Sequence, residues 1–91
     1  MAIKTTHTAT GQSNVQTVHE ACSYYADFTT GSGSGSAQLQ INVGGDWLPA
    51  AAAVTATMSV VGTATANSPG TGRMYRWNVT VSSGEIITYL G

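Results

Sequence analysis

The amino-acid sequence predicts an all-β fold, and three observations support that prediction. Charged residues make up only 8% of the chain while 42% of the residues are hydrophobic, so a core can form. The remaining residues are mostly Thr, Ser, Gly, Asn and Gln, of which Thr favours strands and Gly and Ser favour turns. Several segments alternate apolar and polar side chains with a period of two, which is typical of half-buried strands. At 91 residues the chain forms one domain at most.

The first segment differs from the rest of the chain. Residues 2–16 are polar and rich in Thr, with Ile3 and Val15 as their only larger aliphatic residues. A strand of this composition has little apolar surface to bury. We expect residues 1–16 to form an extended arm that is ordered only where it pairs with a sheet edge or lies on a neighbouring subunit. An ordinary disordered tail is the alternative, and residues 17–91 are expected to form the β domain.

Two strands are predicted in the first half of this domain, at Val18–Thr30 and Ala37–Val43, because both segments alternate. The Gly/Ser-rich residues 31–36 between them are expected to form a hairpin loop. They do not form a phosphate loop, since no Lys partner and no helix pattern follow. The sequence Gly-Gly-Asp at 44–46 predicts a tight turn. Trp47 then covers one end of the core, or, in a rival interpretation, provides a platform for stacking sugars.

The second half is predicted to contain three strands. Residues 52–61 alternate small apolar and polar residues, and residues 67–72 have the composition of a loop. Arg73–Leu90 is predicted to be a hairpin that turns at Ser82-Ser83-Gly84 and closes the core. Its first strand places Trp77 and Val79 on one buried face. Its second strand is apolar on both faces, which indicates a central strand or one covered by a partner.

No catalytic constellation is visible in the sequence. His7 and His19 are the only histidines, and His19 and Glu20 are adjacent on a predicted strand, so they point to opposite faces. The spacing of His7, His19, Cys22 and Asp27 matches no zinc motif, although a ring of histidines around a trimer axis stays open. A lone Cys22 cannot form an internal disulfide and is expected to be a small buried residue. We therefore expect no enzyme activity, no cofactor, no metal and no small-molecule substrate.

The charge pattern excludes further classes of partner. The net charge is −1, and Lys4, Arg73 and Arg76 are the only basic residues besides the histidines. Three scattered cations do not form a patch for nucleic acid or for an anionic membrane. A nearly neutral surface gives little repulsion between copies and so promotes association. No segment resembles a signal peptide or a membrane span, so we expect synthesis and assembly in a cytoplasm.

Two phrases of the sequence resemble those of small β modules in tailed-phage virions. The first is Gln38-Leu-Gln-Ile-Asn-Val-Gly-Gly-Asp-Trp-Leu-Pro49, a strand followed by a Gly-rich turn and a Trp. The second is the closing stretch from Arg73 to Gly91, an Arg-containing strand, a Ser-Gly turn and an apolar strand. The resemblance implies a single small antiparallel β-sandwich or jelly-roll-like domain, here with an extended N-terminal arm. Such modules are capsid decoration (cement) proteins, head fibres and tail components, often trimeric, and they share no catalytic residues.

The resemblance implies a non-enzymatic capsid decoration protein that binds between subunits of the major capsid protein. It would act as a homotrimer on the capsid exterior, after assembly in the bacterial host's cytoplasm, with the arm gripping the capsid or a neighbouring protomer. Candidate interface residues lie on the arm and on the second faces of the closing strands: Ile3, His7, Arg76, Asn78, Ile87 and Tyr89. The alternative is a carbohydrate- or receptor-binding module of a fibre or tail. Its stacking surfaces would come from Trp47 and Tyr25, with Tyr89 and Trp77 as further aromatic residues, although Trp77 is expected to be buried.

Overall fold

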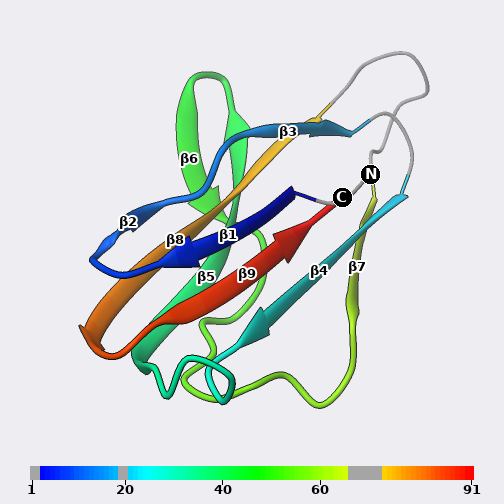
Figure 1. The fold of residues 1–91 in the computed structure, drawn as a ribbon. Coiled ribbons are helices and arrows are strands. Elements are labelled where there is room, and N and C mark those ends of the chain that lie inside the picture. Colours follow the sequence, from blue (N-terminus) through cyan, green and yellow to red (C-terminus); the bar gives the residue numbers. More distant parts are fainter. Residues whose placement is uncertain (1–2, 19–20, 66–72) are drawn as a thin grey trace.

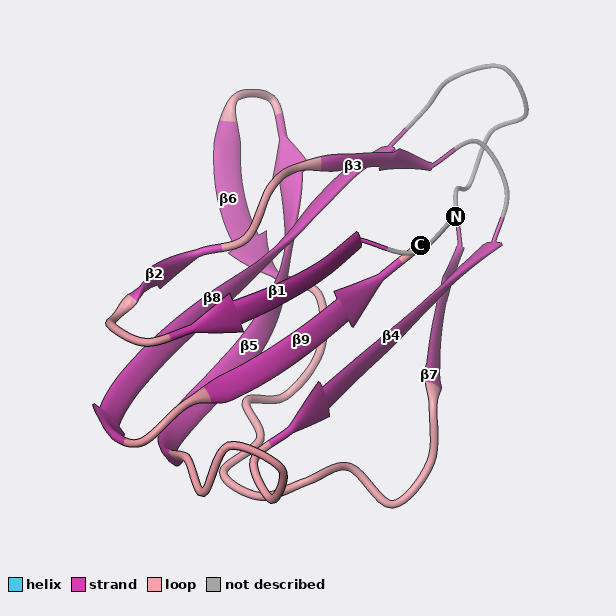
Figure 2. Ribbon diagram, in the orientation of Figure 1, coloured by secondary structure: helices cyan, strands magenta, loops and turns pink. Residues whose placement is uncertain are grey.

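A computed structural model, which describes residues 3–18, 21–65 and 73–91, confirms the all-β prediction: two antiparallel sheets pack face to face as a small β-sandwich. Every regular element in these ranges is a strand (Figure 2). Sheet A has the order β1-β9-β4-β7, and sheet B has the order β2-β8-β5-β6 with β3 also paired to β8. The strands of sheet A are β1 (Ile3–His7), β9 (Ile86–Leu90), β4 (Ala21–Asp27) and β7 (Gly62–Thr65). Those of sheet B are β2 (Gly11–Gln12), β3 (Gln16–Val18), β8 (Arg73–Ser83), β5 (Ser34–Val43) and β6 (Asp46–Pro49).

The core lies between the sheets and follows from the alternation in the sequence. Successive side chains of a strand point to opposite faces, so each strand gives every second residue to the interior. Eleven residues form the buried cluster: Val18, Cys22, Ala26, Phe28, Ala37, Leu39, Tyr75, Trp77, Val79, Ile86 and Leu90. Trp77, predicted to be buried, is 2% exposed. Cys22 is buried as expected.

Trp77 joins the two sheets. Its ring packs against that of Tyr24 with the centroids 5.9 Å apart and the planes tilted by 60°. Its indole Nε1 donates a hydrogen bond to the backbone oxygen of Tyr89, at 3.0 Å, so a side chain of sheet B bonds the main chain of sheet A. A buried indole N–H needs such a partner to avoid a desolvation cost.

The predicted C-terminal hairpin is wrong in one respect. β8 and β9 are adjacent in sequence, but β8 lies in sheet B and β9 in sheet A, so Ser83–Ile86 is a corner between sheets (Figure 1). The Gly/Ser-rich loop is a second corner, because it joins β4 of sheet A to β5 of sheet B. The two corners touch, since Glu85 N donates to Gly31 O at 3.0 Å. The one predicted tight turn that does close a hairpin is the β5–β6 turn, where Gly44 and Gly45 have φ of 62° and 97°.

The strand predicted at residues 52–61 is also wrong. The strand in this region, β7, begins only at Gly62, and the residues before it run irregularly from sheet B to sheet A. This segment bonds both sheets on the way: Val54 and Ala37 exchange backbone hydrogen bonds at 2.8 and 2.9 Å, and Met58 N donates to Ala26 O at 3.1 Å. Because this segment crosses from one sheet to the other, it cannot pair continuously with the strands of either. The need to connect the two sheets therefore overrides its β-propensity.

The first residues belong to the sandwich. The segment 3–18 is extended, as predicted for an arm, but β1 pairs with β9 along five residues while β2 and β3 pair with β8. The predicted boundary at residue 16 therefore does not coincide with a boundary of the fold; it falls at the start of β3. The physical reason is that β9 and β8 would otherwise expose unpaired backbone groups at both sheet edges. The loop predicted at residues 67–72 lies outside the described residues.

A glycine in sheet B tests this packing. Gly35 has a φ of 142° and lies at a register shift between β5 and β8, where an added Cβ would lie 1.9 Å from the backbone oxygen of Thr80. We expect Gly35→Ala to lower the free energy of unfolding by about 1–3 kcal/mol, because the strands must separate to admit the methyl group. Urea denaturation followed by far-UV circular dichroism measures the change.

Gly11→Ala is the matched control, because no heavy atom lies within 4 Å of its added Cβ. Its expected effect is within about 0.5 kcal/mol. Equal losses in the two variants would contradict the close approach of β5 to β8.

Candidate functional site

The outer face of sheet A carries a row of aromatic and basic side chains. Lys4 of β1, Tyr89 of β9 and Tyr25 of β4 are in register across three neighbouring strands. The rings of Tyr25 and Tyr89 lie 6.1 Å apart between centroids and are tilted by 52°, and the Lys4 ammonium lies 6.0 Å from the centre of the Tyr89 ring. Both tyrosines are half-buried. Their positions follow from alternation, because their neighbours Tyr24 and Leu90 point into the sandwich.

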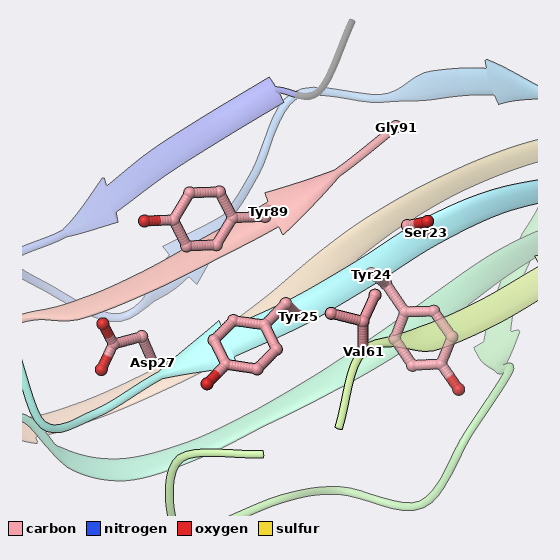
Figure 3. Close-up of a pocket in the computed structure, with 7 residues that line it drawn as sticks. All are labelled: Ser23, Tyr24, Tyr25, Asp27, Val61, Tyr89 and Gly91. Atoms are coloured by element: carbon pink, nitrogen blue, oxygen red, sulfur yellow. The ribbon is translucent and has the colours of Figure 1, made fainter. Parts of the chain in front are cut away.

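These tyrosines line an open cavity of about 350 Å³ on sheet A. Figure 3 shows Tyr25 and Tyr89 on one side of it, with Asp27 next to their phenol groups and Val61 on the other side of Tyr25. Val61 directly precedes β7 and is 58% exposed, and its neighbour Val60 is 71% exposed. We call Tyr25, Tyr89 and Val61 the tyrosine patch. The cavity is lined by Ser23, Tyr24, Tyr25, Asp27, Val61, Tyr89 and Gly91.

Asp27, the one acidic side chain among the described residues that line this cavity, is engaged in its own loop. Its Oδ1 accepts hydrogen bonds from the backbone N–H groups of Thr29 and Thr30 at 2.9 and 3.1 Å, and its Oδ2 accepts one from the Thr30 hydroxyl. The Thr30 hydroxyl, followed by the Thr30 N–H, holds the pKa of Asp27 below its usual value. The carboxylate is thus ionised and committed to ordering the turn after β4, and it has no raised pKa that would suit a general acid.

The outer face of sheet B is polar and largely satisfied by itself. Arg76 donates from Nε to Gln40 Oε1 at 2.9 Å, and its guanidinium lies 4.2 Å from the centre of the Trp47 ring. Gln12 Nε2 donates to Asn78 Oδ1 at 3.1 Å. The other amides predicted to line one face of the strand at 37–43 also bond groups of the same chain: Gln38 Nε2 donates to the backbone oxygen of Ala51 at 3.3 Å, and Asn42 Oδ1 accepts from Gly45 N at 3.2 Å.

The predicted interface residues separate into four groups. Tyr89 lies in the tyrosine patch, whereas Arg76 and Asn78 lie half-buried on sheet B with partners in the chain. Ile3 is half-buried opposite Leu90. For His7 and Ile87 the prediction needs correction, since they are 5% and 7% exposed and so offer little surface to a partner.

The physical reason for the correction differs between the two residues. His7 is on the inward face of β1, where its Nε2 lies 2.9 Å from Thr88 Oγ1. Ile87 points to the outer face of sheet A but lies between Thr6 and Asp27 on the adjacent strands. The sequence could not show that β1 would cover this central strand, because it left open whether the arm pairs with a sheet edge or lies on a neighbouring subunit.

The predicted stacking residues also separate. Trp77 is buried as expected. Trp47 is half-buried and lies on the outer face of sheet B rather than over the end of the core, with the Arg76 guanidinium against its ring. Tyr25 and Tyr89 line the cavity on sheet A. Val61 and Lys4 complete their surroundings but were not singled out as site residues from the sequence. For Val61 the reason is that residues 52–61 were predicted to be a strand within the domain.

Chemically reactive groups are few in the part of the chain that the structure describes. In these ranges no group of three or more His, Cys, Asp or Glu residues could hold a metal ion, and His19 lies outside them. Burial raises the pKa of the Cys22 thiol, which keeps it protonated and unreactive. The described residues also contain no helix long and apolar enough to cross a membrane.

Comparison with known proteins adds no relative. No protein-family model, no curated protein and no solved structure matches this chain.

His7 makes stability depend on pH. Burial lowers the pKa of His7 from its ordinary value of 6.5, because the charged imidazole would lose its hydration in the core. The unfolded chain then binds a proton that the folded chain excludes, so the free energy of unfolding is constant above about pH 6.5 and falls as the pH drops below it. Chemical denaturation at a series of pH values from 7 to 5 measures this slope.

The control variant is His7→Gln, which keeps a side chain that can hydrogen-bond Thr88 but does not titrate. We expect a smaller decline over the same pH interval than in the unsubstituted protein. An identical decline in both proteins would show that another group is responsible.

The two tryptophans should differ in accessibility. In Trp47→Phe, only Trp77 emits, and we expect blue-shifted fluorescence that acrylamide quenches poorly because the ring is 2% exposed. In Arg76→Ala, quenching of Trp47 should rise, since the guanidinium no longer covers its ring. Strong quenching of Trp47→Phe would contradict the burial of Trp77.

Proposed function

We propose that this chain is a non-enzymatic structural protein of a phage virion and that it acts as a capsid decoration (cement) protein. It associates with itself as a homotrimer and binds between subunits of the major capsid protein on the capsid exterior, after assembly in the bacterial cytoplasm. The two sequence phrases that resemble virion β modules support this proposal, as does the low share of charged residues, which is 8% of the chain.

The observation that carries the proposal is the tyrosine patch on sheet A. It combines two half-buried aromatic rings with Val61, which is 58% exposed, and Val60 lies next to it. Tyrosine is enriched at protein interfaces because its ring buries much apolar area while its hydroxyl stays hydrogen-bonded. Such a patch suits contact with a flat protein surface, which depends on shape and area rather than on reaction chemistry.

The charge distribution favours the same side of the molecule. On sheet B, Arg76 and Asn78 are bonded to Gln40 and Gln12, so a partner there would have to replace existing contacts. On sheet A, Lys4 is exposed beside Tyr89 and can meet an acidic group at the rim of an interface. The capsid-facing side is therefore assigned to sheet A.

The cavity that the tyrosines line supports a second candidate function, a carbohydrate- or receptor-binding module. Tyr25 and Tyr89 could stack on a sugar ring, and Ser23 lies in the same lining. Two features weigh against it: the rings are tilted by 52° rather than forming one flat platform, and Asp27 is already bonded to Thr29 and Thr30.

A sedimentation experiment with capsids that lack the protein tests the proposal. We expect the unsubstituted protein to co-sediment with the capsids and Val61→Asp to bind at least about tenfold more weakly, because a carboxylate in a buried interface costs about 1.4 kcal/mol or more. The matched control is Val43→Asp, which changes a valine that is 45% exposed on sheet B.

The proposal fails if the unsubstituted protein does not bind capsids or if both variants bind equally well. Retention of the protein on a column of host surface polysaccharide, abolished by Tyr25→Ser, would instead establish the carbohydrate-binding module.

A further inference from the structure

One continuous segment, residues 3–18, closes the same side of both sheets. Its first strand, β1, is the edge of sheet A and pairs with β9, while β2 and β3 pair with β8 at the edge of sheet B. Figure 1 shows the segment in blue, running along β9 and then along β8. We call residues 3–18 the edge segment. Without it, β9 and β8 would each present an unpaired edge.

The edge segment gives little to the core. Of the eleven residues in the buried cluster only Val18 belongs to it, and the other ten lie between Cys22 and Leu90. The sheet-to-sheet contact between Trp77 and Tyr89 is likewise made outside the segment. The remainder of the sandwich therefore keeps its main apolar contacts when the segment leaves, and an element of this kind opens at a lower free energy than the core.

The contacts that hold the edge segment are polar and directional. Trp77 N donates to Ser13 Oγ at 2.8 Å, and Ser13 N donates to Trp77 O at 2.9 Å. His7 bonds Thr88 inside sheet A, and Val81 N donates to Thr10 Oγ1 at 3.0 Å. Both Ser13 and His7 are buried. These bonds fix one register, so the edges of β9 and β8 recognise this sequence from whichever copy of the chain it comes.

We propose that the edge segment exchanges between copies, so that residues 3–18 of one protomer occupy β9 and β8 of another. The occupant is a second copy of this chain, since only its edge segment supplies the same register and the same buried partners. All the contacts of the closed chain form again in the assembly, which makes exchange a low-cost route to an oligomer.

The exchange differs from the docking surface assigned above. It uses strand edges and links copies of the chain, whereas the tyrosine patch lies on the outer face of sheet A and is assigned to the capsid. Reciprocal exchange closes a dimer, and cyclic exchange among three copies closes a trimer. The inference does not rest on the proposed function, and neither result of its test bears on capsid binding.

Cross-linking across the β2–β8 pair tests the exchange. Gln12 and Asn78 are opposite in register and their side chains touch at 3.1 Å, so cysteines placed there can form a disulfide. The full-length double variant Gln12→Cys/Asn78→Cys is made with Cys22→Ala, to remove the native thiol, and is oxidised after native purification. A denaturing, non-reducing gel then distinguishes a disulfide between two chains, expected for exchange, from a disulfide within one chain. We expect covalent dimers or larger species, because the two cysteines of one bond come from different chains.

A disulfide within one chain, which runs as a monomer on the same gel, overturns the exchange. Lys4→Cys/Tyr89→Cys makes the same test across β1 and β9 and stands alone if the first variant does not fold. The control is Gln12→Cys/Asn42→Cys, also with Cys22→Ala, whose cysteines are not opposite each other in either arrangement. Covalent dimers at equal yield in this control would show random collision and would also overturn the exchange. Mass spectrometry of the linked peptides identifies the bond that formed.

Discussion

The sandwich depends on the position of Trp77, because this one residue contacts both sheets and the segment at the edge of sheet B. Its ring lies in the core against Tyr24, its indole N–H bonds the main chain of β9, and its own backbone N–H and oxygen bond Ser13 at the edge of sheet B. In a chain of 91 residues the core is thin, since a small domain buries a smaller share of its surface than a large one. A large aromatic side chain that also satisfies its polar atom therefore sets the distance between the sheets and the path of the strands around it.

The other consequence of a thin core is that most connections cross from one sheet to the other. The chain changes sheet after β1, β3, β4, β6, β7 and β8, and among the described residues only the β5–β6 connection is a hairpin within one sheet. Glycines meet the steric demands of this arrangement at the corners. Gly31 and Gly33 lie against the backbone of Glu85, where an added Cβ would be 2.5 and 2.2 Å from its oxygen. The low-complexity Gly/Ser stretch is thus part of the folded structure, since side chains at those glycines would collide with the second corner.

The two outer faces differ in what they offer to other molecules. Sheet B carries amide, guanidinium and indole groups that contact one another, although Val43, Leu48 and Met74 of its strands are also exposed. Sheet A differs in presenting two tyrosine rings, with Val60 and Val61 exposed just before β7. The third surface is the pair of strand edges under residues 3–18, which is closed by directional bonds rather than by apolar contacts. These surfaces suit assembly on a face and along an edge. Two ionisable groups near them have structural roles: Asp27 orders a turn, and burial keeps His7 neutral.

The sequence by itself determined the class of fold, the strand faces and much of the core, because alternation with a period of two depends only on local backbone geometry. It therefore placed Trp77 and Cys22 in the core correctly, and it identified the turn at Gly44 and Gly45. Only the tertiary structure decided which strands pair. Contacts between residues distant in the chain decide two things. They decide whether the chain after β8 forms a hairpin or passes to the other sheet, and whether residues 52–61 form a strand or cross between the sheets. The same reason explains the errors at His7 and Ile87, whose burial follows from the pairing of β1 with β9 and not from any pattern around either residue.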